Sequence, residues 1–502
     1  MPIEASMIRF VRRARSSASC CWRNVARRLP GFVVAMTGSL RRLARSYWLR
    51  FPSTLGPTMT DTSHAELTAA LTSRWPEHRV APSLSRIAAL MDLLGEPQRA
   101  YPVIQVAGTN GKGSTAIMIE TLLRSAGLRT GRFASPHLSD VRERIVIDGE
   151  PISAERFDEV WADIEPYVAM VDEQAHDGIA MTFFEVITAM AYAAFADAPV
   201  DVAVMEVGLG GRWDATSVAD AAVAVVAPVG VDHTHILGST LAEIAGEKAG
   251  IIKPRGTAVF AGQQPEAAKV LVAAAAAAGV PFKAEGPDFG VLERSLAVGG
   301  QLLRIDTTGG PIGDVFLPLF GEHMAHNAAL AVAAVEAFLG GKPLNPEIIV
   351  EGLGAVEAPA RLELVRTSPP IVVDTAHNPH AARATIDGVA ESFDFAPTIG
   401  VVAMMQDKDA EEVLEIFAER MDQVVITTMG STTRARKVGD LAAIAETVWE
   451  TSKVHRADTM AEALDLAVML ADTASAQAGV LVAGSVIAAG EARELLNKKE
   501  DS

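Results

Sequence analysis

One segment limits the fold of this chain more than any other: an apolar run that leads into a glycine-rich loop and then a helix. Residues 103–107 (VIQVA) have the pattern of a buried strand, residues 108–115 read GTNGKGST, and residues 116–126 have helical spacing. Glycines let backbone N–H groups close around phosphate oxygens, the helix N-terminus adds positive potential, and Lys112 supplies a mobile cation. The segment predicts a variant of the P-loop, with Gly113 before Ser114 and a shorter spacer than the common GxxxxGK[ST] form.

The loop predicts a nucleoside triphosphate as its ligand. The residues expected to bind it are Gly108, Thr109, Asn110, Gly111, Lys112, Gly113 and Ser114. The plain alternative is a tight strand-to-helix connection that contains one lysine. Because the body of the chain has no Asn-Lys-x-Asp motif that would read guanine, we expect ATP and not GTP.

From Tyr101 onward, apolar β-rich runs alternate with helical patterns, which is typical of parallel strands joined by crossover helices. The expected fold class is therefore α/β. Runs at 102–107, 202–207 and 222–227 predict a larger P-loop-type domain with a mainly parallel sheet. Runs at 371–374, 399–404, 424–428 and 480–483 predict a smaller, C-terminal, Rossmann-like α/β domain. Ligands of open α/β sheets bind beyond the carboxyl ends of the strands, so the site is expected there.

Three segments are predicted along the chain. Residues 357–360 (EAPA) contain a proline that cannot continue the preceding helix, which indicates a boundary. We expect a basic extension at 1–60, a central ATP-binding domain at 61–357 and a C-terminal ligase domain at 358–502. Residues 1–58 contain eleven Arg, no Lys and a single acid, Glu4. This composition fits a disordered or over-read extension, a targeting peptide or a nucleic-acid-binding arm.

Composition limits the classes of partner. The 502 residues include 44 Lys and Arg against 62 Asp and Glu, a net charge of −18. The body outside the basic extension is more acidic still, which argues against a nucleic-acid surface and leaves anion binding to a local pocket. No apolar run reaches the roughly 18 to 20 residues of a membrane-spanning helix, so we expect a soluble protein. We also expect a cytoplasmic monomer. The two cysteines, Cys20 and Cys21, lie in the extension, which excludes a disulfide framework and a cysteine metal site from the body.

Three side chains outside the loop are candidates for metal chemistry. Glu206 closes an apolar strand in the manner of an acidic Mg²⁺ ligand beside a P-loop, and His233 follows the next strand-like run. The ordinary alternatives are a solvated acid at a strand end for Glu206 and a core histidine for His233. Lys248 lies in the helical stretch 241–252, where the ordinary alternative is a surface ion pair with Glu243 or Glu247.

Several separate blocks, in order, make the chain resemble the Mur ligase superfamily and, within it, the folylpolyglutamate synthase and dihydrofolate synthase family. The resemblance covers roughly residues 65–497. The blocks are GTNGKGS at 108–114, SPHL at 135–138, ERI at 143–145, EVGLGGRWDAT at 206–216, DH at 232–233, EKAGIIK at 247–253, GEH at 321–323, NA at 327–328, Arg361 and DTAHNP at 374–379. The chain has Ala360 and Thr375 where the family pattern has glycine, so we expect a different local backbone there.

The resemblance implies roles for individual residues. Ser135, Glu206 and His233 would bind magnesium, and Lys248 would be carbamylated, which turns a cation into a carboxylate-like group. Asn327, Arg361, Asp374 and His377 would contact the nucleotide. Arg144, Thr182, Phe184, Asp214 and Ala215 would bind folate or pterin, with Phe184 stacking on the pterin ring and Asp214 accepting its N–H donors. Aromatic residues at a helix start are otherwise more often core.

The activity that the resemblance implies is an ATP-dependent amide ligation. A substrate carboxylate is phosphorylated by ATP, and the amino group of L-glutamate attacks the acyl phosphate to give an amide, ADP and phosphate. The expected catalytic residues are Lys112, His233, Lys248 and Arg361. The expected cofactors are ATP and Mg²⁺, as two ions, with a monovalent cation as a further candidate, and the expected substrates are folate or dihydropteroate and L-glutamate. The alternatives are another Mur-type amino-acid ligase and a P-loop small-molecule kinase. The sequence leaves open whether the enzyme only extends polyglutamate chains or also makes dihydrofolate.

Overall fold

The computed structural model describes residues 63–74 and 81–500, so the predicted extension at 1–60 lies outside the described residues. The chain divides into two compact units, Met1–Thr72 and Ser73–Ser502. The first unit contains helix α4 (His64–Thr72), whose start is capped by Ser63: the backbone N–H of Glu66 donates to its hydroxyl, and the Glu66 carboxylate accepts from the N–H of Ser63. All other elements belong to the second unit.

The first sheet of the second unit has eight strands in the order β4-β3-β2-β5-β1-β6-β7-β8. Their bounds are β4 Glu150–Pro151, β3 Ile145–Ile147, β2 Thr130–Phe133, β5 Val202–Glu206, β1 Val103–Ala107, β6 Val223–Val226, β7 Thr257–Phe260 and β8 Phe282–Ala284. The neighbouring strands β2, β5, β1, β6, β7 and β8 run parallel, and β3 pairs antiparallel with both β2 and β4. The three predicted runs are the adjacent strands β1, β5 and β6, so the mainly parallel sheet is confirmed.

Helices cover both faces of this sheet. Ile104 and Val106 of β1 pack with α6 (Lys112–Ser125) and α12 (Glu322–Phe338) on one face. Val226 and Phe260 pack with α10 (Leu241–Lys248) and α11 (Pro265–Ala278) on the other. The remaining helices of this part are α5 Ser85–Leu93, α7 Ala154–Gln174, α8 Phe183–Asp197, α9 Thr234–Leu237 and α13 Pro346–Gly354, with short 3₁₀ turns at η1 Pro97–Arg99, η2 Val141–Arg144, η3 His176–Gly178, η4 Ala215–Val218 and η5 Ala249–Ile251. Burial on both faces explains why the central strands β5, β1 and β6 are mostly apolar.

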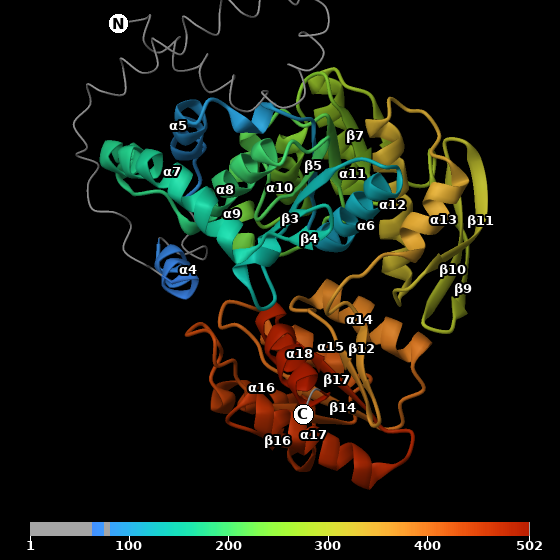
Figure 1. Ribbon diagram of the computed structural model, residues 1–502. Coiled ribbons are helices and arrows are strands. Elements are labelled where there is room, and N and C mark those ends of the chain that lie inside the picture. The colour runs from blue at the N-terminus through green and yellow to red at the C-terminus, as the bar shows by residue number, and fades with distance from the viewer. Residues whose placement is uncertain (1–62, 75–80, 501–502) are drawn as a thin grey trace, which may run out of the picture. The chain divides into compact units, whose positions relative to one another are not determined.

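A three-stranded antiparallel sheet follows α11, and no strand was predicted there. Its order is β11-β10-β9, with bounds β9 Gly290–Ala297, β10 Gly300–Thr307 and β11 Gly310–Leu317. Only one face is buried: Leu303, Ile305 and Val315 join the same core as α12. Figure 1 shows these strands beside α12 and α13. Polar residues interrupt the apolar stretches of these strands and many of their side chains are exposed, so they lack the fully buried run that marks β1.

The C-terminal part forms the predicted Rossmann-like domain. Its sheet has the order β12-β13-β17-β14-β15-β16, with bounds β12 Glu363–Thr367, β13 Pro370–Val373, β17 Gly479–Ala483, β14 Thr398–Val402, β15 Gln423–Ile426 and β16 Val454–Arg456. Only β12 is antiparallel. Helices α17 (Met460–Ala474) and α18 (Val486–Glu500) pack on one face, and α14 (Pro379–Ser392), α15 (Ala410–Ala418) and α16 (Val438–Val448) pack on the other, with one turn at η6 Thr451–Lys453. The four predicted runs are β13, β14, β15 and β17.

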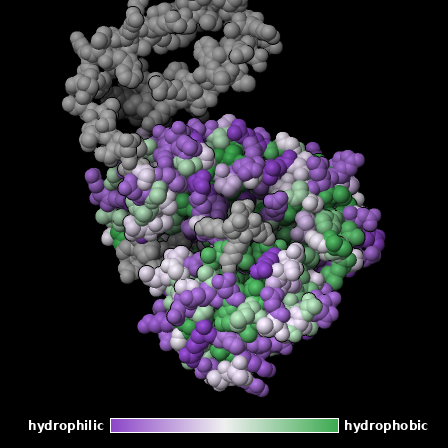
Figure 2. Space-filling model, turned by 60° about the horizontal axis from the view of Figure 1, so that its bottom comes forward, coloured by the Kyte–Doolittle hydropathy of each residue, from purple (hydrophilic) through white to green (hydrophobic). Residues whose placement is uncertain are grey.

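The visible surface of the protein is mixed in hydropathy. Hydrophilic and hydrophobic residues are interspersed over the face seen in Figure 2. Within the part of the chain that the structure describes, no helix is both long and apolar enough to cross a membrane.

Candidate active site

The predicted P-loop joins β1 to α6 at the carboxyl edge of the first sheet. The helix begins at Lys112, four residues earlier than predicted, so Lys112, Gly113 and Ser114 lie in its first turn. Gly111 is the N-cap with a φ of 82°, a left-handed conformation that glycine adopts without a steric penalty. The first N–H groups of a helix have no intrahelical acceptor. The turn therefore presents donors to an anion, as the sequence predicted.

Two lysines face the carbonyl side of this loop. Lys112 Nζ donates to the carbonyl oxygens of Gly108 and Thr109 at 3.1 and 3.0 Å, and Lys248 Nζ donates to that of Gly108 at 2.7 Å. Lys248 is buried, so the alternative of a surface ion pair is wrong. Burial, reinforced by the charge of Lys112, lowers the pKa of Lys248 to about 7. Burial also lowers the pKa of Lys112.

Glu206 lies at the end of β5 and is buried, which excludes the alternative of a solvated acid. Its carboxylate accepts the backbone N–H of Ser135 at 3.2 Å, and burial raises its pKa although Lys112 opposes the shift. A methyl group built on Gly113 would lie 3.5 Å from both carboxylate oxygens of Glu206 and 3.6 Å from Nη2 of Arg361. The first turn of α6 therefore lies between an acid of the first sheet and an arginine that precedes the second.

Asp232 and His233 follow β6 and face residues of the C-terminal domain. Asn378 Nδ2 donates to Asp232 Oδ2 at 3.0 Å, and Lys408 Nζ donates to both Asp232 oxygens at 3.0 and 3.2 Å. Burial alone would raise the pKa of Asp232, but the charges of His233 and Lys408 outweigh it and hold the pKa well below its usual range. Partial burial and Lys408 lower the pKa of His233 to about 4, so its imidazole is neutral at neutral pH.

The other residues predicted to bind nucleotide come from α12 of the first domain and from the loop after β13 of the C-terminal domain. Asn327 on α12 is adjacent to the P-loop, because a methyl group on Gly111 would lie 2.7 Å from its Oδ1. Asp374 accepts the N–H groups of Leu362 and Ala376 and the hydroxyl of Thr385, so its carboxylate organises the loop after β13. His377 Nδ1 faces the carbonyl of Thr375 at 2.9 Å, and burial lowers the pKa of its ring to about 4.

The two departures from the family pattern have local effects. Ala360 has a φ of 55°, so it adopts a left-handed conformation although it is not glycine. The hydroxyl of Thr375 accepts a hydrogen bond from Nη1 of Arg361. Glycine at position 375 would not offer this acceptor, so in this chain Thr375 orients the arginine.

The predicted folate residues lie together near the start of α8. The guanidinium carbon of Arg144 lies 5.1 Å from the centre of the Phe183 ring, and Phe184 packs on Gly208, where a methyl group would lie 2.5 Å from its ring. Thr182 caps α8 with Glu185. Ala215 is buried in η4.

Asp214 is occupied by its own loop. Its carboxylate accepts the N–H groups of Gly208 and Leu209 on one oxygen and the N–H and hydroxyl of Thr216 on the other. These four hydrogen bonds match the roughly four acceptor positions of a carboxylate, so Asp214 shapes its own loop. The proposed contact with substrate stays a prediction.

Sequence reasoning missed three residues that complete this region. Lys408 and Asn378 contact Asp232 from the second sheet, and Arg86 on α5 is buried against Glu185. Lys408 lies a few residues beyond the predicted strand at 399–404, so its place at a strand end was a usable signal. Arg86 had no such signal, because its partner is 99 residues away.

The side chains present fit a magnesium ion for which substrate and water supply most of the ligands. Within the described ranges, no group of three or more His, Cys, Asp or Glu residues is placed to hold a metal. Glu206 supplies a buried carboxylate and His233 a neutral imidazole, whereas Lys248 as an ammonium would repel a metal. Mg²⁺ commonly binds through one or two protein ligands plus substrate phosphates.

Comparison with known proteins identifies relatives over most of the chain. The Mur ligase middle domain matches residues 106–335, and the Mur ligase, glutamate ligase domain matches residues 360–486. The dihydrofolate synthase/folylpolyglutamate synthase of Mycobacterium tuberculosis (strain ATCC 25618 / H37Rv) is 46% identical over 452 residues, which is 85% of this chain and 93% of the relative. The structure of Mycobacterium tuberculosis folylpolyglutamate synthase complexed with ADP matches with a TM-score of 0.83 at 45% identity, over 86% of this chain and 98% of that chain. Escherichia coli FolC in complex with DHPP and ADP matches with a TM-score of 0.75 at 28% identity, over 90% and 100% of the two chains.

Proposed function

Because the chain belongs to the folylpolyglutamate synthase and dihydrofolate synthase family of the Mur ligases, which are ATP-dependent ligases, we propose that it joins L-glutamate to a carboxylate of a folate. One observation carries this proposal for this chain. Glu206, from the end of β5, and Arg361, from the start of the C-terminal domain, both lie beside the first turn of α6, which begins with Lys112 of the P-loop. Such a site can bind a triphosphate between the two domains.

The nucleotide is held by the P-loop and by residues of both domains. The N–H groups of the first turn of α6 bind phosphate oxygens, and Lys112 exchanges the carbonyls of Gly108 and Thr109 for phosphate. Asn327 lies beside Gly111, and Arg361 lies beside Gly113. Asp374 and His377 shape the loop that carries the C-terminal side of the nucleotide site.

The reaction needs positioning and charge neutralisation and no protein nucleophile. A carboxylate oxygen of the folate attacks the γ-phosphorus of ATP, the bond to the bridging oxygen breaks, and ADP leaves. The amino group of glutamate then attacks the acyl carbon, loses a proton and displaces phosphate, which leaves an amide. Lys112 and Arg361 offset the charge that spreads over the transferred phosphoryl group. The C-terminal domain keeps water from the acyl phosphate.

Magnesium would be held by Glu206 and His233, with Ser135 next to Glu206. The Oε2 atom of Glu206 accepts the Ser135 backbone N–H, so that loop and the carboxylate are already adjacent. When bound, Mg²⁺ supplies positive charge to the phosphate oxygens. We propose two magnesium ions and, as a further candidate, a monovalent cation. Metal analysis of the enzyme with bound nucleotide measures how many ions of each kind it holds.

Lys248 would serve the metal as a carbamate. Its amine is buried beside the P-loop and has a pKa of about 7, so a large part of it is neutral at neutral pH. The neutral amine adds to the carbon of CO₂ and releases one proton, which gives a carbamate anion. This reverses the charge of the side chain and removes the misfit between an ammonium and a metal.

We propose dihydropteroate as a second acceptor, which would make the enzyme bifunctional. The support is the cluster of Arg144, Phe184 and the loop around Asp214, together with the names of relatives that carry both activities. A cytoplasmic location, a monomeric state and the absence of a nucleic-acid partner stay predictions.

Product analysis tests the proposal. The purified chain is incubated with ATP, Mg²⁺, L-glutamate and a reduced folate whose carboxylate carries oxygen-18. We expect a product heavier by one glutamyl residue and one oxygen-18 atom transferred to inorganic phosphate. A phosphorylated product without glutamate would identify a kinase, and phosphate without the label would exclude the acyl phosphate. The same assay with 7,8-dihydropteroate tests the second acceptor.

A further inference from the structure

A partly buried ion pair joins the two domains next to the P-loop. Lys408, in the loop after β14, donates to both oxygens of Asp232 at 3.0 and 3.2 Å. The side chains of Lys408 and Asp232 are only 11% and 13% exposed. A pair this sheltered from water is screened far less than one on the surface, and it depends on both partners.

The pair continues directly into the P-loop. Asn378 Nδ2 donates to Asp232 Oδ2 and to Asn110 Oδ1, each at 3.0 Å. Asn110 Nδ2 in turn contacts Nδ1 of His380 at 2.8 Å. Asn110 belongs to the phosphate loop of the first sheet, whereas Asn378 and His380 begin α14 of the second. A chain of polar contacts thus runs from Lys408 to the phosphate loop.

The loop that carries Lys408 is itself fixed. Arg436 Nη2 donates to the carbonyls of Gln406 and Lys408, both at 3.0 Å, and the N–H of Arg436 donates to the carbonyl of Met404 at 2.8 Å. The N–H of Gln406 donates to the carbonyl of Arg434 at 3.1 Å. The backbone of Lys408 is therefore held on its own domain, and its side chain reaches across to the other.

We propose that Lys408 is a positioning residue of the ligase reaction: by pairing with Asp232 it aligns the C-terminal domain, and with it Arg361, on the P-loop. This inference rests on the proposed function, in which Arg361 must reach the phosphoryl group bound by the other domain. Lys408 acts through Asp232 and not on the substrate. Its Nζ also lies 3.5 Å from Nε2 of His233, so the same side chain limits where that imidazole can lie.

A second ion pair between the domains provides a matched control. Arg294 on β9 pairs with Glu391 near the end of α14, whereas Asn378 and His380 lie at the start of that helix, so this pair shares no residue with the chain of polar contacts. Glu391→Gln removes a charge pair between the same two domains without touching the chain from Lys408 to Asn110. If any weakening of the contact between the two domains lowered activity, both Lys408→Met and Glu391→Gln would be affected. If alignment at the P-loop matters, only the Lys408 variant would be affected.

The kinetic test compares Lys408→Met, Lys408→Arg and Glu391→Gln with the wild type. Because misplacement of a reacting group by about 1 Å can cost on the order of 100-fold, we expect kcat to fall by about that factor in Lys408→Met. The thermal midpoint of all variants is measured in parallel. Lys408→Arg should recover most of kcat because it restores the pair, and Glu391→Gln should stay within about twofold of wild type. Asp232→Asn should lower kcat similarly, and the double variant should be no worse than either single variant, because both lose one pair.

A second readout does not depend on turnover. Cys20 and Cys21 are the only cysteines of the chain, so with both changed to Ser, spin labels can be placed on Lys269→Cys of α11 and Glu415→Cys of α15. We expect a broader distribution of distances in Lys408→Met than in the wild type, Lys408→Arg or Glu391→Gln. An unchanged distribution in Lys408→Met, additive effects in the double variant, or equal loss in Glu391→Gln would overturn the inference. Lack of ligase activity in the wild type would refute the proposed function and leave the distance test to decide the role of Lys408.

Discussion

The ammonium groups of Lys112 and Lys248 donate to the same carbonyl oxygen, that of Gly108, at 3.1 and 2.7 Å. One comes from the first turn of α6 and the other from the last turn of α10, so 136 residues of chain separate them in the sequence but not in space. Two cations on one acceptor repel each other, and burial and the charge of Lys112 both lower the pKa of Lys248. Lys248 is therefore partly neutral at neutral pH, as its proposed carbamylation requires.

Replacing Lys112 tests the phosphate site. We expect Lys112→Ala to lower kcat for ADP formation by about 100-fold or more, because a preorganised cation on the transferred phosphoryl group is lost. The circular dichroism spectrum should not change, since Lys112 contacts only loop carbonyls. Lys269→Ala on the exposed side of α11 is the control and should have wild-type kcat. Normal turnover in Lys112→Ala would refute the P-loop assignment.

Thr375 gives Arg361 a hydrogen-bond acceptor, and its hydroxyl can be removed with little change in shape. We expect Thr375→Val to lower kcat/KM for ATP by about tenfold, because one hydrogen bond to a charged group contributes roughly 1.5 kcal/mol or more. Thr375→Ser keeps the hydroxyl and should have nearly wild-type kinetics. Equal kinetics of Thr375→Val and Thr375→Ser would show that the hydroxyl does not orient the arginine.

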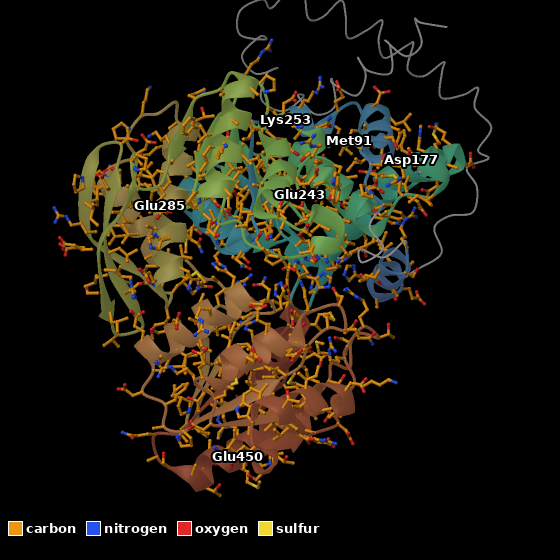
Figure 3. All side chains as sticks on the ribbon, turned by 180° about the vertical axis from the view of Figure 1, so that it is seen from behind. Met91, Asp177, Glu243, Lys253, Glu285 and Glu450 are labelled. Carbon is orange, nitrogen blue, oxygen red and sulfur yellow. The ribbon has the colours of Figure 1, made fainter. Side chains whose placement is uncertain are left out.

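Arg86 and Glu185 form a buried pair beneath the proposed folate site. Arg86 Nε donates to both carboxylate oxygens at 3.0 and 3.1 Å, and its Nη1 lies 3.2 Å from Oδ2 of Asp177, which Figure 3 labels. We expect Arg86→Met to lower the free energy of unfolding by about 3–5 kcal/mol, because the carboxylate of Glu185 stays buried without its partner. Chemical denaturation gives this value.

The double variant Arg86→Met, Glu185→Gln separates charge from packing. It no longer buries an unpaired charge, so we expect it to be more stable than Arg86→Met alone. If the double variant is as unstable as the sum of the single variants, packing and not the ion pair stabilises the start of α8.

His326 on α12 pairs with Glu285, labelled in Figure 3, and this pair predicts how stability depends on pH. The hydrogen bond with Glu285 raises the pKa of His326, so protonation of His326 stabilises the fold. This contribution is complete below the pKa of the unfolded chain and is lost as the pH rises through the pKa of the folded protein.

We therefore expect His326→Gln to lower the thermal midpoint at about pH 5.5 and to change it less at about pH 8.5. His455→Gln is the control, because His455 faces the amide of Gln423 and not a carboxylate. A larger effect of His326→Gln at the higher pH would show that protonation of this histidine does not stabilise the fold.

Buried parallel strands and the phosphate loop were predictable because their signals are local. Residues 480–483 are a continuous apolar run and residues 103–107 are interrupted only by Gln105, since both faces of their sheets are covered by helices. The P-loop combines a strand, glycines, a lysine and a helix within about 25 residues. The strands β9–β11 escaped prediction because one face is exposed and polar residues interrupt their apolar stretches.

Side-chain partners over long sequence separations were not predictable from local pattern. Lys408 meets Asp232 across 176 residues, and only the fold brings them together. The four hydrogen bonds that occupy Asp214 also depend on the path of its loop, so residue type alone suggested a substrate contact. Residue type and local sequence pattern therefore identified the candidate residues of the site but not the partners that each side chain contacts.

The most direct test of the proposed ligase activity is ADP release by the purified protein with ATP and Mg²⁺, with and without L-glutamate and a reduced folate. We predict sustained ADP release only when both glutamate and the folate are present, with one ADP formed for each glutamate incorporated. Sustained ADP release without glutamate, or none with all components in a protein that binds ATP, would contradict the proposed activity.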